Sequence, residues 1–227
     1  MKKILAAAVG VALLSPLTAM AQEAPAEGKW QVKLLGTAVL ADGKVKSVKN
    51  DAAGVVSSGI VTGTKANDNV VPTVAVEYFF TPNISLETIC CVTGHHVSVT
   101  SGSAKGAVAV DNVQIIPATF TAKYHMPLGP IKPYVGVGPT LFIMLNDRPS
   151  AAVQALGVTR TKMSSELGVA VQAGADIAIG HGYSLTLDAK KYWVSTDATF
   201  YAGNAVALQT RHKLDPWVLS AGLAWRF

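Results

Sequence analysis

The sequence predicts an all-β fold, an eight-stranded antiparallel transmembrane β-barrel with short turns at one end and long loops at the other. Three observations predict it. Apolar residues recur at every second position in eight segments, and the connections between segments alternate between short and long. Half of the residues are hydrophobic, yet no apolar run beyond residue 21 is long enough for a membrane-spanning helix. A closed barrel reconciles these features, because only alternate positions face lipid.

The first residues predict a signal peptide. Lys2 and Lys3 precede the apolar run Ile4–Leu14, and small residues follow up to Ala21. We expect residues 1–21 to be removed and residues 22–227 to form the barrel. A membrane anchor is the alternative, but the apolar run is short and a cleavage site follows it. Cleavage lowers the formal charge from +5 to +3, and this dispersed excess indicates no nucleic-acid partner.

The first two predicted strands are Trp30–Ala41 and Val70–Phe80. In the first, large apolar residues alternate with a face that carries Lys33 and Thr37. In the second, Glu77 lies opposite a face of valines and aromatic residues. A period of two with one apolar face is typical of a strand that has lipid on one side and the lumen on the other.

The third and fourth predicted strands are Ile84–Val92 and Gln114–Met126. Glu87 lies on the polar face of the third strand, and Lys123 lies on that of the fourth. The same alternation therefore continues across both segments, and each contributes one charge to the predicted lumen.

The fifth and sixth predicted strands are Ile131–Leu145 and Met163–Ile179. The fifth is apolar on both faces, so its facing stays open. The sixth has the clearest alternation in the chain. Its apolar face begins at Met163, and Glu166 and Asp176 lie on the other face.

The last two predicted strands are Tyr183–Val194 and Trp217–Phe227. Asp188 and Lys190 lie on the polar face of the seventh strand. The eighth has apolar residues at the odd positions through its last residue, with Arg226 on the opposite face. A strand that meets lipid on one face and the lumen on the other has this pattern.

The connections predict which end of each strand faces the periplasm. Three are short, around Pro82, Gly129 and His181. Four are long and polar or rich in small residues: Asp42–Asn69, Thr93–Val113, Asn146–Lys162 and Ser195–Lys213. In an outer-membrane barrel the short turns are periplasmic, so both termini are expected there. A soluble eight-stranded barrel is the alternative, but aromatic residues near the strand ends favour a membrane girdle.

Several segments resemble the OmpW family of Gram-negative outer-membrane proteins. They are Pro117–Tyr124, Lys132–Gly138 and Leu214–Trp217, and the similarity runs in order along the whole chain after the signal peptide. Members are eight-stranded barrels implicated in passage of small hydrophobic molecules across the outer membrane, so the resemblance implies this fold and transport. The ending with Trp225 and Phe227 resembles the signal read by the barrel-assembly machinery.

Nine charged residues are expected to face the lumen. Opposite charges in a confined interior should pair, because an unpaired buried charge is costly. We predict a salt-bridge network that blocks straight passage, with structural filling as the alternative for each member. The residues are Lys33, Glu77, Glu87, Lys123, Glu166, Asp176, Asp188, Lys190 and Arg226.

Two prolines are candidates for a lateral exit. Pro72 and Pro117 fall early in predicted strands, and proline removes a ladder hydrogen bond. Pro117 also matches a proline of the family's motif. We hypothesise that weakened pairing near Pro117 releases hydrophobic solutes sideways into the lipid. In the alternative, both prolines only mark strand starts.

The remaining conspicuous residues predict little chemistry. Cys90 and Cys91 are expected as free thiols on opposite faces of a strand. His95 and His96 are expected on a loop surface. The sequence shows no phosphate loop, metal-ligand spacing or nucleophile elbow, so no cofactor or metal is expected.

Three functions remain to be separated. We expect a narrow channel for passive uptake of small hydrophobic or amphipathic molecules, with outer-membrane lipid, these solutes and the assembly machinery as partners. The main alternative is a structural or receptor-type barrel without transport. A lipid-modifying enzyme is disfavoured, because His95, His96 and His125 have no evident catalytic partner in the sequence.

Overall fold

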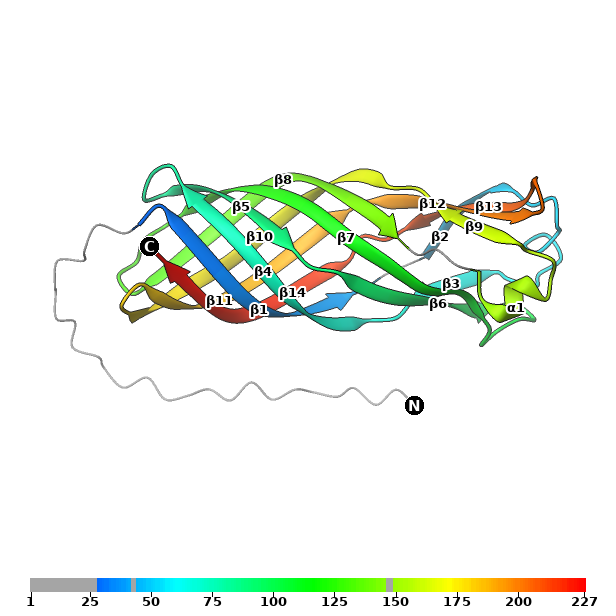
Figure 1. Ribbon diagram of the computed structural model, residues 1–227, viewed down its shortest axis with the longest axis horizontal. Coiled ribbons are helices and arrows are strands. Elements are labelled where there is room, and N and C mark those ends of the chain that lie inside the picture. The colour runs from blue at the N-terminus through cyan, green and yellow to red at the C-terminus, as the bar shows by residue number, and fades with distance from the viewer. Residues whose placement is uncertain (1–27, 42–43, 146–148) are drawn as a thin grey trace.

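A closed antiparallel barrel forms the body of the protein (Figure 1). The computed structural model describes residues 28–41, 44–145 and 149–227. Each wall strand pairs with the next, and the last pairs back with the first. In order around the ring they are β1 (Trp30–Leu40), β4 (Asn69–Phe79), β5 (Ile84–Cys90), β7 (Val108–His125), β8 (Ile131–Leu145), β10 (Glu166–Gly180), β11 (Tyr183–Trp193) and β14 (Trp217–Arg226). The predicted eight-stranded antiparallel barrel is confirmed.

The predicted signal peptide, residues 1–21, lies outside the described residues. No helix in the described part of the chain is long and apolar enough to cross a bilayer.

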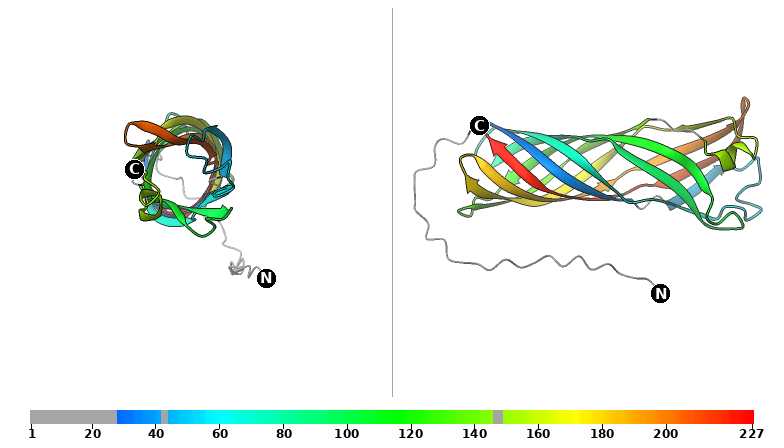
Figure 2. Two further views of the ribbon diagram at one scale, coloured as in Figure 1. Left: turned by 90° about the vertical axis from the view of Figure 1, so that its right-hand side faces the viewer. Right: turned by 60° about the horizontal axis from the view of Figure 1, so that its bottom comes forward.

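The two faces of the wall differ as the alternation predicts. On β14 the side chains of Trp217, Leu219 and Trp225 are 44–50% exposed, whereas Val218 and Ser220 between them are buried. Viewed down the barrel, the strands form a closed ring around one lumen (Figure 2). The exposed apolar face is the surface that lipid covers, and the buried face fills the interior.

The structure shows which residues of β8 face the lumen, a point that its sequence leaves open. Tyr134, Thr140 and Phe142 are buried in the lumen, and Val135 and Val137 are exposed on the outer face. The inward aromatic rings occupy space that the small residues of neighbouring strands leave, since Gly174 of β10 lies against the Tyr134 ring.

Three short turns gather at one end of the barrel, the turn end. They connect β4 to β5, β7 to β8 and β10 to β11. The ends of the described chain lie at this end too (Figure 1), where Phe227 N–H donates to the Trp30 carbonyl at 2.9 Å. His181 and Gly182 in the tightest turn have positive φ angles of 53° and 79°. Those angles allow a two-residue reversal of the chain.

The opposite end, the extension end, corrects the prediction of four long loops. These segments are mostly strand: β2 (Lys44–Asn50), β3 (Gly63–Ala66), β6 (Thr93–Ser101), the first residues of β7, β9 (Arg160–Met163), β12 (Ser195–Ala202) and β13 (Ala205–Lys213), with one helical turn, α1 (Ala151–Gln154). β2, β13, β12 and β9 form a second sheet, and β3 and β6 prolong the barrel sheet. The small and β-branched residues of these segments suggested loops. The same residues can also form strands whose two faces meet the lumen and the outside of a narrow barrel.

The sixth predicted strand is also corrected. The chain leaves the ladder at Ser164–Ser165, between β9 and β10. This break changes the side of the wall that each residue faces, so Met163 packs inward beside Val110, Val113 and Phe200 rather than facing lipid.

The pairing of β14 with β1 leaves no room for a side chain at Gly222. A Cβ atom there would lie 2.0 Å from the Leu34 carbonyl oxygen, whereas a Cβ at Gly36 would meet its nearest atom, the Ala221 oxygen, at 3.9 Å. We expect Gly222→Ala to destabilise the barrel by about 2 kcal/mol or more, because the strand that closes the ring must move. Gly36→Ala should stay within about 0.5 kcal/mol of wild type. Denaturant unfolding in lipid vesicles measures both, and equal stabilities would contradict this account of closure.

Candidate functional site

Seven charged side chains meet in the half of the lumen nearer the turn end. They come from β1, β4, β5, β7, β10 and β11, and each is at most 7% exposed. We call this group the plug; its members are Lys33, Glu77, Glu87, Lys123, Asp176, Asp188 and Lys190. All seven belong to the predicted lumenal set.

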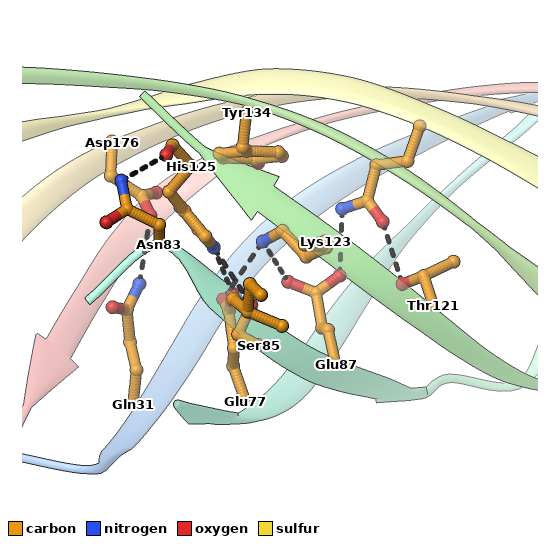
Figure 3. Close-up of polar contacts among 12 residues, drawn as sticks. Gln31, Glu77, Asn83, Ser85, Glu87, Thr121, Lys123, His125, Tyr134 and Asp176 are labelled. Atoms are coloured by element: carbon orange, nitrogen blue, oxygen red, sulfur yellow. Dashed lines mark hydrogen bonds and ion pairs between the residues drawn. The ribbon is translucent and has the colours of Figure 1, made fainter. Parts of the chain in front are cut away.

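Two glutamates lie at the centre of the plug. Lys33 Nζ is 2.8 Å from Glu77 Oε2 and 2.9 Å from Glu87 Oε2. Lys123 Nζ bridges the same two oxygens at 2.9 and 3.0 Å (Figure 3). Lys190 Nζ continues the network, 3.1 Å from Glu87 Oε1. Each ammonium group thus contacts a carboxylate in a site that excludes water.

Aspartates extend the network on β10 and β11. Lys190 Nζ lies 2.8 Å from Asp188 Oδ1, and Lys33 Nζ lies 3.8 Å from Asp176 Oδ2. Within the plug, three lysines therefore face four carboxylates. Neutral donors have to satisfy the carboxylate oxygens that remain.

Uncharged side chains supply those donors. Gln172 Nε2 donates to Glu87 Oε1 at 2.9 Å and to Asp188 Oδ2 at 2.6 Å. The Tyr134 hydroxyl donates to Asp188 Oδ2 at 2.8 Å, and the Lys123 ammonium lies 3.6 Å from the centre of its ring. Sequence reasoning left Tyr134 and Gln172 out of the network because it selected residues by charge. The inward position of Gln172 in the alternation was the available signal.

Two of the nine predicted lumenal charges lie elsewhere. Glu166 Oε1 accepts a hydrogen bond from Ser164 Oγ at 2.8 Å, at the extension end of β10. Arg226 lies at the turn end, where its guanidinium is 3.5 Å from the centre of the Phe79 ring and donates to the Gly28 carbonyl at 2.7 Å. The plug therefore fills the half of the lumen nearer the turn end, and the lumen is narrow in any eight-stranded barrel.

His125 has partners that the sequence did not reveal. Its Nε2 lies 2.9 Å from Ser85 Oγ and 2.8 Å from Glu77 Oε1 (Figure 3). These three residue types occur in hydrolase triads, but there the serine and the carboxylate contact different ring nitrogens. Here one nitrogen contacts both, and all three side chains are at most 1% exposed. The arrangement is that of a buried hydrogen-bond network rather than a catalytic site.

Between the plug and the extension end the interior becomes apolar. An inner cavity of about 60 Å³ is lined by residues that include Ile89, Pro117, Phe142, Tyr192 and Val218. Four of its lining residues, Val39, Phe142, Tyr192 and Val218, belong to one packed cluster that also contains Ala170 and Val194.

An outer cavity of about 180 Å³ lies within the extension strands, lined by residues that include Ile60, Val99, Phe200 and Leu208. It exceeds the roughly 150 Å³ at which an apolar protein cavity holds a benzene molecule. Burial lowers the pKa of His212 in its wall, which favours the neutral imidazole. The two cavities adjoin, because Ala66, Val97, Met163 and Leu214 line both.

The barrel wall is interrupted beside the inner cavity. The β5–β7 ladder ends at Ile89 with Thr119, and the β6–β7 ladder resumes at Thr93 with Ile115 in the same register. Three pairs are missing between them in the described wall, and the register sets Cys91 opposite Pro117. We call this interruption, Cys90–Val92 with its facing residues, the seam.

Both predicted exit prolines border the seam. On its other side the β4–β5 ladder ends at Val74 with Cys90, and continuing that register sets Val92 opposite Pro72. Pro117 is buried and lines the inner cavity, whereas Pro72 is exposed on the outer face. Neither proline can donate a backbone hydrogen bond to the segment between them.

A second irregularity lies in the β7–β8 ladder. The pairs that would join Phe120 to Pro139 and Thr121 to Gly138 are missing there. A Cβ at Gly138 would lie 1.8 Å from the Phe120 carbonyl oxygen, so the two strands approach closely. None of these four residues lines the inner cavity.

The cysteines and histidines singled out in the sequence take different positions. Cys90 is exposed and Cys91 is buried, and both are free thiols. The loop-surface prediction is wrong for His95, which is 4% exposed in β6 and hydrogen-bonds with the Asn67 carbonyl at 2.8 Å. His96 is exposed. In the described residues no three His, Cys, Asp or Glu side chains cluster in a way that would hold a metal ion.

Comparisons with known proteins agree with this architecture. The sequence profile of the OmpW family matches residues 26–227. The uncharacterized outer-membrane protein y4mB of Sinorhizobium fredii is 29% identical over 97% of this chain and 90% of its own length. Outer membrane protein W of Vibrio cholerae is 26% identical over 96% of this chain and 97% of its own. The crystal structure of OprG from Pseudomonas aeruginosa superposes with a TM-score of 0.68 at 18% identity, over 88% of this chain and 97% of that one.

The plug predicts a large effect of one neutralising substitution. Glu87→Gln keeps the side-chain shape but removes the charge that Lys33, Lys123 and Lys190 share. We expect it to cost about 3–5 kcal/mol of unfolding free energy, because buried lysines lose their counter-ion. Glu166→Gln, whose carboxylate bonds to Ser164, should cost less than about 1 kcal/mol. Urea unfolding in vesicles compares the two, and a loss at Glu87 no larger than at Glu166 would contradict an ion-paired plug.

Proposed function

The chain belongs to the OmpW family of outer-membrane barrels, and we propose that it takes up small hydrophobic or amphipathic molecules passively and releases them sideways into the membrane. In this proposal the extension end faces the outside and the turn end faces the periplasm with both chain ends. Residues 1–21 direct secretion, and Trp225 and Phe227 contribute the signal for the barrel-assembly machinery.

The apolar cavities support the choice of solute. The outer and inner cavities adjoin and are lined mainly by Val, Ala, Ile and Leu side chains. An apolar molecule that leaves water for such a lining gains about 25 cal/mol for each Å² of apolar surface buried. A small polar solute would lose its hydration and find few partners. The path thus favours hydrophobic cargo.

The plug supports an exit other than the periplasmic one. To continue straight down the lumen, a solute would have to separate Lys33 and Lys123 from Glu77 and Glu87. Separating buried ion pairs is costly, and an apolar solute offers the exposed charges no replacement. A hydrophobic molecule in the inner cavity therefore needs a way through the wall.

The seam is the strongest support for a lateral exit. Its segment Cys91–Val92 lies outside the ladder on both sides, between Pro72 and Pro117. Pro117 also lines the inner cavity. Parting the strands there breaks fewer hydrogen bonds than elsewhere in the wall, and lipid lies immediately outside.

A structural or receptor-type barrel without transport is the alternative function. Deletion of the protein separates the two, since a non-transporting barrel would leave permeability to alkanes, fatty-acid-like probes and small polar solutes unchanged. If the protein is a channel for hydrophobic molecules, deletion should slow the entry of the hydrophobic probes alone.

Pro117→Ala tests the lateral exit. The substitution gives residue 117 an N–H group that can pair across the seam. One additional hydrogen bond is worth about 1 kcal/mol, which corresponds to about a fivefold slower release. We expect uptake of the dye N-phenyl-1-naphthylamine by intact cells to slow by this factor at equal protein levels.

The matched control is Pro139→Ala, which makes the same change at the other ladder irregularity, away from the inner cavity. It should leave dye uptake at the wild-type rate. Unchanged uptake in Pro117→Ala at normal protein level would remove the lateral-exit role. Slower uptake in Pro139→Ala alone would move the exit to the β7–β8 boundary.

A further inference from the structure

The extension is interrupted between β2 and β3. In the described residues β2 pairs with β13 alone and β3 pairs with β6 alone, so each strand is the edge of a different sheet. The two strands lie next to each other at the extension end (Figure 1), and no ladder joins them. Parting them breaks no ladder hydrogen bonds, because both edges are unpaired. We call this boundary the gap.

A recess of about 850 Å³ lies at the gap. Val45 of β2 and Thr64 of β3 both line it. Together with Thr62 they also line the outer cavity. The recess and the apolar outer cavity therefore adjoin at the gap, between two strands that are not bonded to each other.

The recess begins where the lipid-facing wall ends. Leu40 and Trp217 form the last pair of the β1–β14 ladder at this end of the barrel, and both line the recess with exposed side chains. Aromatic side chains near the end of a membrane strand lie at the lipid–water interface. The recess is thus at the depth of the lipid head groups, within reach of a molecule that lies in that interface.

The charged residues of the recess are mostly basic. They are Lys44, Lys65, Lys191, Asp68 and Asp215. The buried Asp215 already has partners for both carboxylate oxygens, because Oδ1 accepts the Val194 N–H at 2.8 Å and Oδ2 lies 2.9 Å from Lys213 Nζ. Three lysines and one further aspartate remain, so the recess carries a net positive charge.

Two of these lysines lie on opposite sides of the gap. Lys44 is on β2 and Lys65 is on β3, and both side chains are exposed. Lys191 lies at the rim, where its Nζ donates to the Asp215 carbonyl at 2.5 Å and is 5.2 Å from the centre of the Trp217 ring. Ammonium groups form strong, charge-assisted hydrogen bonds with a carboxylate. The recess therefore suits an anionic head group.

We propose that the recess binds amphipathic monocarboxylates. Lysines on the two edges of the gap hold the carboxylate, and the apolar body of the solute lies between β2 and β3 in the outer cavity. That cavity, about 180 Å³, exceeds the roughly 150 Å³ that holds benzene, so a body of that size fits. This inference rests on the proposed uptake function and adds the head-group chemistry of the solute.

The two halves of the site select this class together. The net positive charge disfavours an amphiphile with an ammonium head group. A small inorganic anion would meet the lysines but would leave the apolar cavity without a partner. A neutral amphiphile would use the cavity and gain nothing from the lysines. A single negative charge on an apolar body uses both.

The test compares 4-phenylbutyrate, 4-phenyl-1-butanol and 4-phenylbutylamine, which share an apolar body and differ in the charge of the head group at neutral pH. Their dissociation constants are measured by calorimetry with the full-length protein in phosphatidylcholine nanodiscs. Empty nanodiscs give the partition into lipid, which is subtracted. We expect the wild-type protein to bind the carboxylate about fivefold more tightly than the alcohol, the effect of about 1 kcal/mol, and the amine most weakly.

The test variant is Lys44→Gln with Lys65→Gln. The matched control is Lys46→Gln with Lys105→Gln, two exposed lysines of the extension end that line neither the recess nor the two cavities. Both variants lose two positive charges, so a difference between them reports the position of the charges. All four side chains are exposed, and folding is checked by the heat-dependent gel mobility of the barrel.

We expect the test variant to bind 4-phenylbutyrate about fivefold more weakly than wild type, with the alcohol unchanged. The control should bind all three probes as wild type does. Added salt should weaken binding of the carboxylate alone, because it screens exposed charges. Equal wild-type affinities for the three probes, or equal losses in the two variants, would overturn the carboxylate site.

Magnetic resonance locates the apolar body of the bound solute. Contacts of the phenyl protons with the methyl groups of Val99 are expected, because this buried residue lines the outer cavity and not the recess. Contacts with Leu40 alone would overturn the placement of the body in the gap.

Uptake of 4-phenylbutyrate by intact cells separates the site from the uptake function. Wild-type cells should take it up faster than deletion cells and than cells with the test variant. If wild-type and deletion cells take it up equally, the uptake function fails, and the dissociation constants still decide whether the carboxylate site exists.

Discussion

A wall that stands in lipid must satisfy its own backbone hydrogen bonds, because hydrocarbon offers no partners. The rest of this structure follows from that constraint. Eight antiparallel ladders close on themselves, and closure at β14 and β1 is tight enough to require glycine at position 222. Against this near-complete pairing, a segment that leaves the ladder on both sides is exceptional. The seam at Cys91–Val92 is such a segment, and it lies between two residues that have no N–H group.

The same alternation that builds the wall divides the interior into two parts. Side chains at the inward positions near the turn end are charged. Their opposite charges pair with one another, and neutral donors such as Gln172 bond to the carboxylates. Inward positions toward the extension end are uncharged and mainly apolar, and they leave two adjoining cavities. The boundary lies at Tyr192 and Lys190, successive inward residues of β11. A solute that enters the apolar part meets the seam at the depth where the charged part begins.

Much of this arrangement could be predicted from the sequence, because a strand has a period of two. That period identified the eight wall strands and the inward position of residues such as Lys33 and Glu87. It could not give the partners, since contacts between β1 and β5 depend on how far neighbouring strands are shifted on closure. For the same reason, the network of Ser85 with His125 and Glu77 emerged only from the structure.

The seam and the strands at the extension end could not be predicted from the sequence, for different reasons. The apolar alternation runs through Cys90–Val92 without a visible break, so only the prolines marked the place. The extension strands are short and rich in small residues, which a sequence reading assigns to loops.

A reversible cross-link across the seam tests whether solutes leave the barrel there. In a Cys90→Ser background, Pro117→Cys places a second thiol at the position that the continued register sets opposite Cys91, so that a disulfide between them holds the seam closed. We predict that uptake of a hydrophobic dye stops when the disulfide forms and returns when a reductant opens it, in the same protein. Equal uptake by the oxidised and reduced forms, with the cross-link verified by mass spectrometry, would contradict exit through the seam.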